Sequence, residues 1–295
     1  MMGKLATEPF DSPDHLFEIK WDGTRCIAFV EQGDAPLRMQ NRRFFEMRDR
    51  YPELGGLTGL PAGTVLDGEV VVLDDGKPSF TRIQQRDHVT DPRRAEMLAR
   101  HMPAMIMAFD LLYDGGHKIT DAPLTQRRSR LAEIVKSLGD PHVMMSEHVV
   151  EHGVKYFEAV TRFGLEGMMA KRLTSPYLPG KRTDDWLKIK VARTETFDVI
   201  GYVQREGERA VSALLVAMRQ GRRWMFKGGV GTGFTEGDRR DFFERFSKSP
   251  PLPNPPKDGP KDAVWRDAGV QCRVRFFEKT VTGRLRGPVF EGFVE

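Results

Sequence analysis

Cysteine is nearly absent from this sequence. Only Cys26 and Cys272 occur among 295 residues, far apart and without a C-x-x-C pattern, which excludes a disulfide framework and a cysteine-rich zinc site. Long apolar runs are missing too: runs such as residues 70–73 are far too short to cross a bilayer. Because residues 1–10 also lack the charged start and apolar stretch of a secretory signal, we expect a cytoplasmic protein without a membrane segment.

A strong excess of one charge is missing as well. The formal net charge is +4, and 39% hydrophobic with 30% charged residues is typical of a folded protein. From Arg193 onward there are 19 lysines and arginines against 14 acidic residues, whereas the preceding part holds 27 against 28. The length suits two domains, and the basic rear part suits binding of a polyanion.

The first two thirds of the chain predict a mixed α+β domain. Short runs rich in Val, Ile and Phe, each ended by Gly or Asp, predict strands at 17–20, 26–30, 65–73 and 104–112. Apolar residues at helical spacing predict helices at 125–138 and 155–163. This order is not a regular βαβ array, so we expect mixed or antiparallel sheets.

After Lys190 the pattern changes to short strands around one helix. We expect strands at 197–204, 211–219, 222–227 and 270–277, a hairpin turn at Gln220-Gly221 and a helix at 234–246. Six prolines in residues 249–260 predict a stiff, exposed connector. These features predict a small β-barrel of the OB type, a common nucleic-acid module. We place the boundary near 191–194, giving domains 1–192 and 193–295.

The strongest local signal is the sequence KWDGTR at residues 20–25. It places the amine of Lys20, the carboxylate of Asp22 and the guanidinium of Arg25 around one tight turn. Lysine is a poor nucleophile at its usual pKa of about 10.4 and needs desolvation or neighbouring cations to react. Arginine suits a sugar or phosphate oxygen beside it. A nucleophilic lysine is one interpretation, and an ordinary hairpin with surface charges is the other.

This hexapeptide resembles the nucleotide-attachment motif of the covalent nucleotidyltransferases: ATP-dependent DNA ligases, RNA ligases and mRNA capping enzymes. Further motifs of these enzymes appear in the same order across the chain: Asn41-Arg42, Asp67-Gly68-Glu69, Phe109-Asp110, EGMMAK at 166–171 and WLKIK at 186–190. The resemblance implies that Lys20 carries AMP. It also identifies residues 1–192 as the nucleotidyltransferase domain and 193–295 as an OB domain.

The chemistry of AMP transfer accounts for the residue types in these motifs. Charge spreads over the phosphoryl oxygens, so positioned cations do most of the work. Lys188 and Lys190 alternate with apolar residues along a strand, so both face one side and can converge on a phosphate; a solvated lysine face is the alternative. The resemblance implies that Glu69 contacts the ribose, and that Glu166, assisted by Asp22, holds a divalent metal. We expect Mg2+, with Mn2+ as an alternative, bound by few carboxylates plus phosphate oxygens and water.

The adenine site is expected on the neighbouring strands. Phe109 offers a flat face to adenine, although its role as a core aromatic is equally compatible with the pattern. The other nucleotide contacts implied by the resemblance are the main chain of Glu18 and Ile19 at the adenine edge, Arg25 and Arg42 at the ribose and the acceptor phosphate, and Lys171.

Motifs in the second domain, residues 193–295, restrict the resemblance to one group of these enzymes. KGGVGTGF at 227–234 and RLRGPVF at 284–290 look like the OB domain of bacterial ligase D enzymes. Arg284 and Arg286 are expected to reach the pyrophosphate of ATP or to touch DNA phosphates, with a hinge at 191–194 for both states. Because only 19 residues precede Lys20, we expect a stand-alone minimal form. The resemblance implies a monomer near the nucleoid that seals nicked double-stranded DNA in repair or end joining, with a DNA end-binding protein as a candidate partner.

Other functions fit the sequence less well. An RNA ligase or a GTP-using capping enzyme is opposed by the ligase-D-like tail. A non-catalytic nucleic-acid-binding relative is opposed by the intact set of charged motif residues. HVVEH at 148–152 spells H-x-x-E-H, a metalloprotease pattern when it lies on a long helix, but the β-branched pair and the glycine at 153 predict no such helix.

Overall fold

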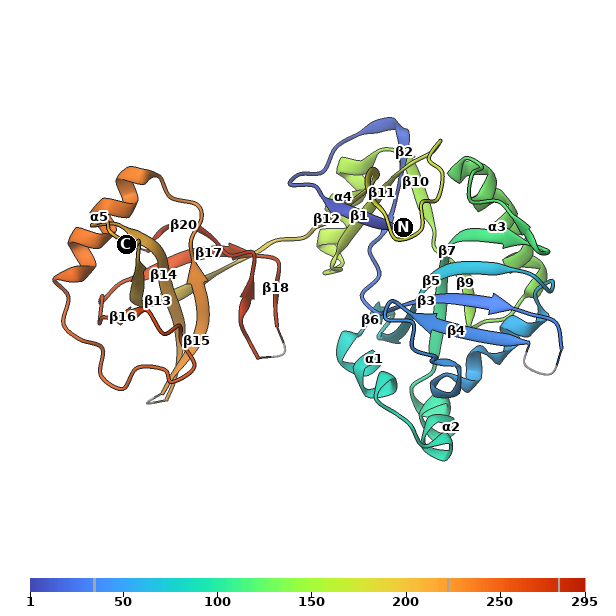
Figure 1. Cartoon of the computed structure of the whole chain (residues 1–295), viewed down its shortest axis with the longest axis horizontal. Coiled ribbons are helices and arrows are strands. Elements are labelled where there is room, and N and C mark those ends of the chain that lie inside the picture. Colours follow the sequence, from blue (N-terminus) through green and yellow to red (C-terminus); the bar gives the residue numbers. More distant parts are fainter. Residues whose placement is uncertain (34–35, 222, 281, 295) are drawn as a thin grey trace. The chain divides into compact units, whose positions relative to one another are not determined.

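The computed structural model describes residues 1–295 except 34–35, 222, 281 and 295 (Figure 1). It divides into two compact units, Met1–Lys190 and Val191–Glu295. None of the helices in the described ranges has the length and apolar composition needed to cross a membrane.

The described part of the first unit forms two main sheets. One sheet has the order β1-β12-β11-β2-β10, in which β1 pairs with β12 in parallel and the other neighbours are antiparallel. Its strands are β1 (Met2–Leu5), β2 (Ser12–Ile19), β10 (His148–Glu151), β11 (Gly167–Arg172) and β12 (Arg182–Lys190). The other sheet has the order β4-β3-β5-β7-β8, with β6 on β5 and β9 parallel to β7. Its strands are β3 (Thr24–Val30), β4 (Leu37–Asn41), β5 (Val65–Asp74), β6 (Lys77–Pro78), β7 (Ala104–Asp114), β8 (His117–Lys118) and β9 (Val143–Met145).

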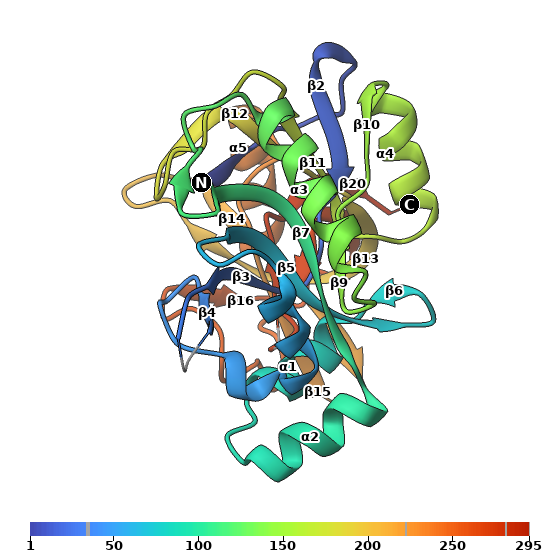
Figure 2. The same ribbon diagram turned by 90° about the vertical axis from the view of Figure 1, so that its right-hand side faces the viewer.

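Helices cover the second of these sheets and leave its other side to face the first sheet. Figure 2 shows α3 running along β7. The helical segments of this layer are η1 (Arg48–Arg50), η2 (Pro52–Gly59), α1 (Phe80–Asp87), α2 (Pro92–His101) and α3 (Leu124–Leu138), whereas α4 (Gly153–Arg162) packs on β2 and β11 of the first sheet. The main core lies between this helical layer and β3, β5 and β7, and a smaller cluster with Phe109, Tyr177 and Trp186 joins the two sheets.

The residue pattern explains the placement of the strands. Along β3 buried and half-buried residues alternate, so Cys26, Ala28 and Val30 face the core while Arg25 and Ile27 face the other sheet. The continuous apolar run of β5 has neighbours on both edges and both faces, and Val70, Val71 and Val72 are all buried. The burial pattern of these strands and their hydrogen-bonded pairing therefore both place them at the centre of the unit.

The second unit is an antiparallel barrel-like domain with one described α-helix. Its main sheet has the order β15-β14-β13-β17-β20, with β16 on β13 and a separate β18-β19 pair. The elements are β13 (Arg193–Gln204), β14 (Val211–Gln220), β15 (Arg223–Val230), α5 (Glu236–Ser247), β16 (Ala263–Trp265), β17 (Gln271–Phe276), β18 (Glu278–Lys279), β19 (Leu285–Arg286) and β20 (Val289–Phe293). The expected fold class is confirmed: an α+β domain is followed by an OB-like antiparallel domain.

Two local expectations can be compared with the structure. His148–Glu151 forms strand β10 and not a helix, so the metalloprotease interpretation of HVVEH is excluded by its geometry. The proline-rich segment is exposed over most of its length, as expected, and only Leu252 of residues 249–260 is buried. Leu252 is 6% exposed and packs with Ile200 and Phe226 on the outer face of the barrel sheet, because that face is apolar and requires a cover.

A buried ion pair anchors α3 to β7. Arg127 Nε lies 2.7 Å from Asp110 Oδ1 and its Nη2 lies 2.9 Å from Oδ2, and both side chains are fully buried. Arg130, one turn later, makes a comparable pair with Asp114, but its side chain is 42% exposed. A charge left alone in the interior is costly, whereas an exposed charge is solvated by water.

The two arginines of α3 provide a matched stability test. We expect Arg127→Ala to lower the free energy of unfolding by about 3 to 5 kcal/mol, because Asp110 would stay buried without its partner. Arg130→Ala should cause a much smaller change. Urea unfolding followed by circular dichroism measures both, and equal effects of the two substitutions would contradict this ranking.

Candidate active site

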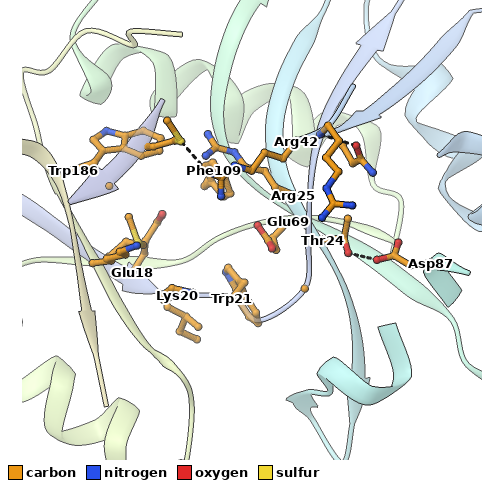
Figure 3. Close-up of a pocket in the computed structure, with 18 of the residues that line it drawn as sticks. Glu18, Lys20, Trp21, Thr24, Arg25, Arg42, Glu69, Asp87, Phe109 and Trp186 are labelled. Atoms are coloured by element: carbon orange, nitrogen blue, oxygen red, sulfur yellow. Dashed lines mark hydrogen bonds between the residues drawn. The ribbon is translucent and has the colours of Figure 1, made fainter. Parts of the chain in front are cut away.

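A cavity of about 660 Å³ lies in the first unit, with walls from both of its sheets (Figure 3). The first sheet contributes residues of β2, β11 and β12, and the second contributes residues of β3, β5 and β7. Nine of the residues expected at a nucleotide site line it: Glu18, Ile19, Lys20, Arg25, Arg42, Glu69, Phe109, Lys171 and Lys188. Residues from distant parts of the sequence therefore meet at one hollow.

Lys20 lies directly after strand β2 and is held at both ends. Its main-chain N–H donates to the carbonyl oxygen of Gly167 at 2.9 Å, and its Nζ donates to Glu166 Oε2. The other carboxylate oxygen of Glu166 lies 2.9 Å from the Nζ of Lys190. The carboxylate of Glu166 thus binds two ammonium groups. A third ammonium group, that of Lys188, lines the cavity. Burial and the neighbouring charges of Arg182 and Lys190 lower the pKa of Lys188.

Two glycines allow this close assembly. A Cβ on Gly167 would lie 2.2 Å from the carbonyl oxygen of Ile189, and its φ of +154° is rare for other residues. A Cβ on Gly23 would lie 2.2 Å from the carbonyl oxygen of Val70 and 3.1 Å from Cγ of Glu69. The turn after Lys20 can therefore rest directly on β5, beside Glu69.

Another part of the cavity is aromatic. Phe109 and Trp186 meet edge to face at 6.1 Å between ring centroids, and the Nζ of Lys171 lies 4.1 Å and 4.0 Å from the two ring centroids. Lys171 also pairs with Glu18 Oε1 at 2.5 Å, and Arg128 donates to Glu18 Oε2 at 2.7 Å. Phe109 belongs to the buried cluster and also lines the cavity, so a place in the core does not exclude a place at the site; its contact with adenine remains a prediction.

Arg25 and Glu69 lie on neighbouring strands of the second sheet. Arg25 Nε donates to Asp67 Oδ1 at 2.9 Å, and the hydroxyl of Tyr177 donates to Asp67 Oδ2 at 2.7 Å. Asp67 is fully buried, so this carboxylate holds the arginine in place. Burial raises the pKa of Glu69 to about 8, although the charges of Lys20 and Arg25 oppose the shift. At neutral pH Glu69 can therefore donate as well as accept a hydrogen bond.

Several expected site residues are not among those that line the cavity. Among the described residues that line the cavity, Asp22, Glu166 and Lys190 are not included, although Glu166 and Lys190 contact those that are. Arg284 and Arg286 belong to the second unit. There, Arg284 pairs with Asp258 and Arg286 with Glu278, each at 2.8 Å. Their expected roles remain predictions.

The acidic residues do not by themselves form a metal site. No group of three or more His, Cys, Asp or Glu side chains within the described ranges could hold a metal ion. Both oxygens of Glu166 are engaged by lysines, so this donor set does not fit a metal held by the protein alone. The assignment of a metal to Glu166 and Asp22 remains a prediction.

The cavity also contains residues to which the sequence analysis gave no role. Trp186 begins the WLKIK motif and occupies the same side of β12 as Lys188 and Lys190, two and four residues later, so strand alternation alone could have placed it there. Arg50, Asp87 and His88 line the cavity as well. No local pattern marks these three, because they reach the site only through tertiary packing of α1 and η1.

The raised pKa of Glu69 predicts a specific dependence of stability on pH. Between pH 4.5, the ordinary value, and about pH 8 the folded chain keeps a proton on Glu69 that the unfolded chain releases. The contribution of this group to the free energy of unfolding must therefore fall as the pH rises through that window. Thermal unfolding of the wild type and Glu69→Gln across these pH values should show that only the wild type loses this part. Parallel profiles would contradict the prediction.

Comparison with known proteins agrees with this geometry. Residues 4–190 match the ATP dependent DNA ligase domain family, and residues 207–295 match the ATP dependent DNA ligase C terminal region. The SPbeta prophage-derived DNA ligase-like protein LigB of Bacillus subtilis is 29% identical to the chain over 97% of it and 95% of LigB. The solved structure of mycobacterial DNA ligase D complexed with ATP and MES is 29% identical, covers 99% of this chain and 93% of that chain, and superimposes with a TM-score of 0.58.

A larger relative is also matched. The multifunctional non-homologous end joining protein LigD of Pseudomonas aeruginosa is 31% identical over 95% of the chain. The chain spans about a third of the length of that protein, 33%. The family expected from the motifs is confirmed, since the nucleotidyltransferase match alone covers more than half of the chain. The chain belongs to the ATP-dependent DNA ligase family.

Proposed function

We propose that this chain is an ATP-dependent DNA ligase that forms a covalent lysyl-AMP intermediate on Lys20. The observation that carries the proposal is the position of Lys20 in a cavity with aromatic walls in one part and lysines in another. A base-sized apolar surface and a cluster of cations are what a nucleoside and its phosphates require.

The adenosine part of ATP fits the aromatic region. Phe109 and Trp186 provide ring faces and edges for adenine, and Lys171 supports both rings from beneath at about 4 Å. We infer that the main chain of Glu18 and Ile19 reads the adenine edge. Glu69 suits the ribose, because a carboxyl that retains its proton at neutral pH can donate to a sugar oxygen.

The three steps follow from this placement. Lys20 gives a proton to its neighbour Glu166, its Nζ bonds to the α-phosphorus of ATP, and pyrophosphate leaves. An oxygen of the 5′-phosphate at a nick then attacks that phosphorus, the P–N bond breaks and the amine leaves with the proton returned from Glu166. The 3′-hydroxyl finally loses its proton to water, attacks the 5′-phosphate and displaces AMP, which forms the phosphodiester. Lys188 and Lys190 stabilise the charge on the phosphoryl oxygens in these steps.

The divalent metal enters, in this proposal, together with ATP as part of the substrate. Mg2+ prefers phosphate oxygens, water and one or two carboxylates to a site made entirely by protein. This agrees with the absence of a metal-binding cluster among the residues described. Glu166 and Asp22 are the carboxylates that could join such a complex, and no step above depends on them doing so.

The acceptor is proposed to be nicked double-stranded DNA. Arg42 lines the cavity with its side chain exposed and suits the 5′-phosphate, and the second unit, with the basic residues Arg284 and Arg286, suits the duplex. The match to LigD proteins, which are named for non-homologous end joining, supports a role in repair or end joining. A DNA end-binding protein is the corresponding proposed partner.

Replacing the nucleophile gives the direct test of this proposal. We expect Lys20→Ala to abolish covalent labelling by radiolabelled ATP and with it the sealing of nicked DNA, because the substitution removes the proposed nucleophile. With ATP, wild-type protein should seal nicked DNA more efficiently than nicked RNA. On nicked DNA, it should work more efficiently with ATP than with GTP. Persistent label on the variant, or preference for RNA or GTP, would contradict the assignment.

Lys188 should act on the chemistry and not on DNA affinity. We expect Lys188→Ala to slow adenylation by about 100-fold, since it removes one positioned donor to the phosphates, while gel-shift affinity for nicked DNA stays near the wild-type value. Lys136→Ala, which removes an exposed lysine in the last turn of α3, serves as the matched control. Equal losses of adenylation and DNA affinity in Lys188→Ala would point to a structural role.

A further inference from the structure

A hydrogen-bonded network centred on Asp87 connects the turn after Lys20 to another wall of the cavity. Asp87 is the last residue of α1. Its Oδ2 accepts from the hydroxyl of Thr24, which lies inside the KWDGTR motif (Figure 3). Its Oδ1 accepts from the hydroxyl of Tyr51 at 2.6 Å, and its main-chain oxygen accepts from Nη1 of Arg50 at 2.6 Å. One residue therefore joins three segments of the chain.

The base of this network is rigid and buried. Tyr51 is 1% exposed, and burial together with the Asp87 carboxylate raises the pKa of its phenol, so the phenol keeps its proton and donates. Behind it, the fully buried Arg86 donates to the main-chain oxygen of Arg50 at 2.7 Å and pairs with Glu53 at 2.8 Å. These contacts fix the position of Asp87, which also lines the cavity.

The wall around Asp87 carries arginines. Thr24, Arg42, Arg50 and His88 line the cavity with it, and Arg50 contacts Asp87 directly. In Figure 3 Thr24 and Asp87 lie together, on the opposite side of Glu69 from Glu18 and Trp186, whereas the side chain of Arg42 extends toward Met2, to whose sulfur its Nη2 donates at 3.4 Å. These arginines are complementary to a second phosphate beside those of the nucleotide, and a DNA strand supplies one.

Lys20 itself does not depend on this network. Its main chain is held by Gly167 and its Nζ by Glu166, both on the first sheet's side of the cavity. Arg25, at the far end of the motif, is held by Asp67. The bond from Thr24 to Asp87 therefore fixes the end of the turn, where β3 begins, and leaves the amine attached by other contacts.

We propose, on the basis of the ligase function above, that Asp87 is a positioning residue for the DNA-dependent steps. It holds Thr24 and Arg50 in register, so that the wall which receives the 5′-phosphate of the nick stays aligned with the adenylate on Lys20. Loss of the Asp87–Thr24 bond should then slow AMP transfer to DNA and leave adenylation of the enzyme almost unchanged.

Single-turnover kinetics separate the two halves of the reaction. In Asp87→Asn one carboxylate oxygen is replaced by an amide NH2 group, which cannot accept a hydrogen bond, so one of the two hydroxyl partners loses its acceptor. Thr24→Val removes the hydroxyl that donates to Asp87. Thr24→Ser keeps that hydroxyl and serves as the conservative variant. Starting from adenylated enzyme and nicked DNA, we expect the first two variants to seal about tenfold more slowly, the loss of one hydrogen bond to a charged group. Their adenylation by ATP should change by less than about twofold, and Thr24→Ser should seal at nearly the wild-type rate.

Two controls show whether the effect belongs to this bond. Asp74→Asn weakens an exposed ion pair between the end of β5 and Arg82, which lies on α1 like Asp87. This variant should alter neither half-reaction. The double variant Asp87→Asn/Thr24→Val should lose less than the two single losses combined, because both changes act on the contact between Asp87 and Thr24. Equal losses in both half-reactions, or undiminished sealing by Asp87→Asn, would overturn the proposal. A wild-type protein that failed to adenylate or to seal would instead contradict the ligase function itself.

Discussion

The arrangement of ammonium groups around the Glu166 carboxylate is the constraint on which the site depends. Lys20 and Lys190 would repel one another in a half-buried position without an acidic partner. Glu166 binds both through its two oxygens, which keeps the amine at the cavity before any nucleotide arrives. A phosphate that enters there can replace the carboxylate as the counter-charge. The same residues can therefore hold the free enzyme together and, in the proposed reaction, stabilise a transferring phosphoryl group.

The fold makes this cluster by bringing strand ends together. β2, β11 and β12 are neighbours in one sheet, so Lys20, Glu166 and Lys190 meet although up to 170 residues separate them in sequence. Gly167 permits the close approach of β11 and β12 at that point. The second sheet supplies Glu69 and Phe109 across the cavity. The chemistry thus arises from two rigid sheets within the first unit, which suits a site that must orient one phosphorus atom.

Sequence reasoning reached the parts of this site that short motifs or strand alternation mark. The turn after Lys20, the lysines of β12 and the acidic residue of β5 all carry such local signals. It did not reach Asp87, Arg50 or His88, because their place depends on how η1 and α1 pack on the sheet. It also missed β1, whose residue Met2 lies beside Arg182 through a parallel pairing across 180 residues. The burial of Leu252 within the proline-rich segment was not expected, because the composition of that segment does not indicate the apolar face that it covers.

The central claim is that one amine, that of Lys20, accepts the adenylate. It is tested most directly by incubating the protein with ATP and magnesium, digesting it and locating the added AMP by mass spectrometry. The account predicts a single adenylated peptide, with the modification on Lys20, that disappears when nicked DNA is added before digestion. An adenylate on another residue, or a protein that never gains one under these conditions, would contradict it.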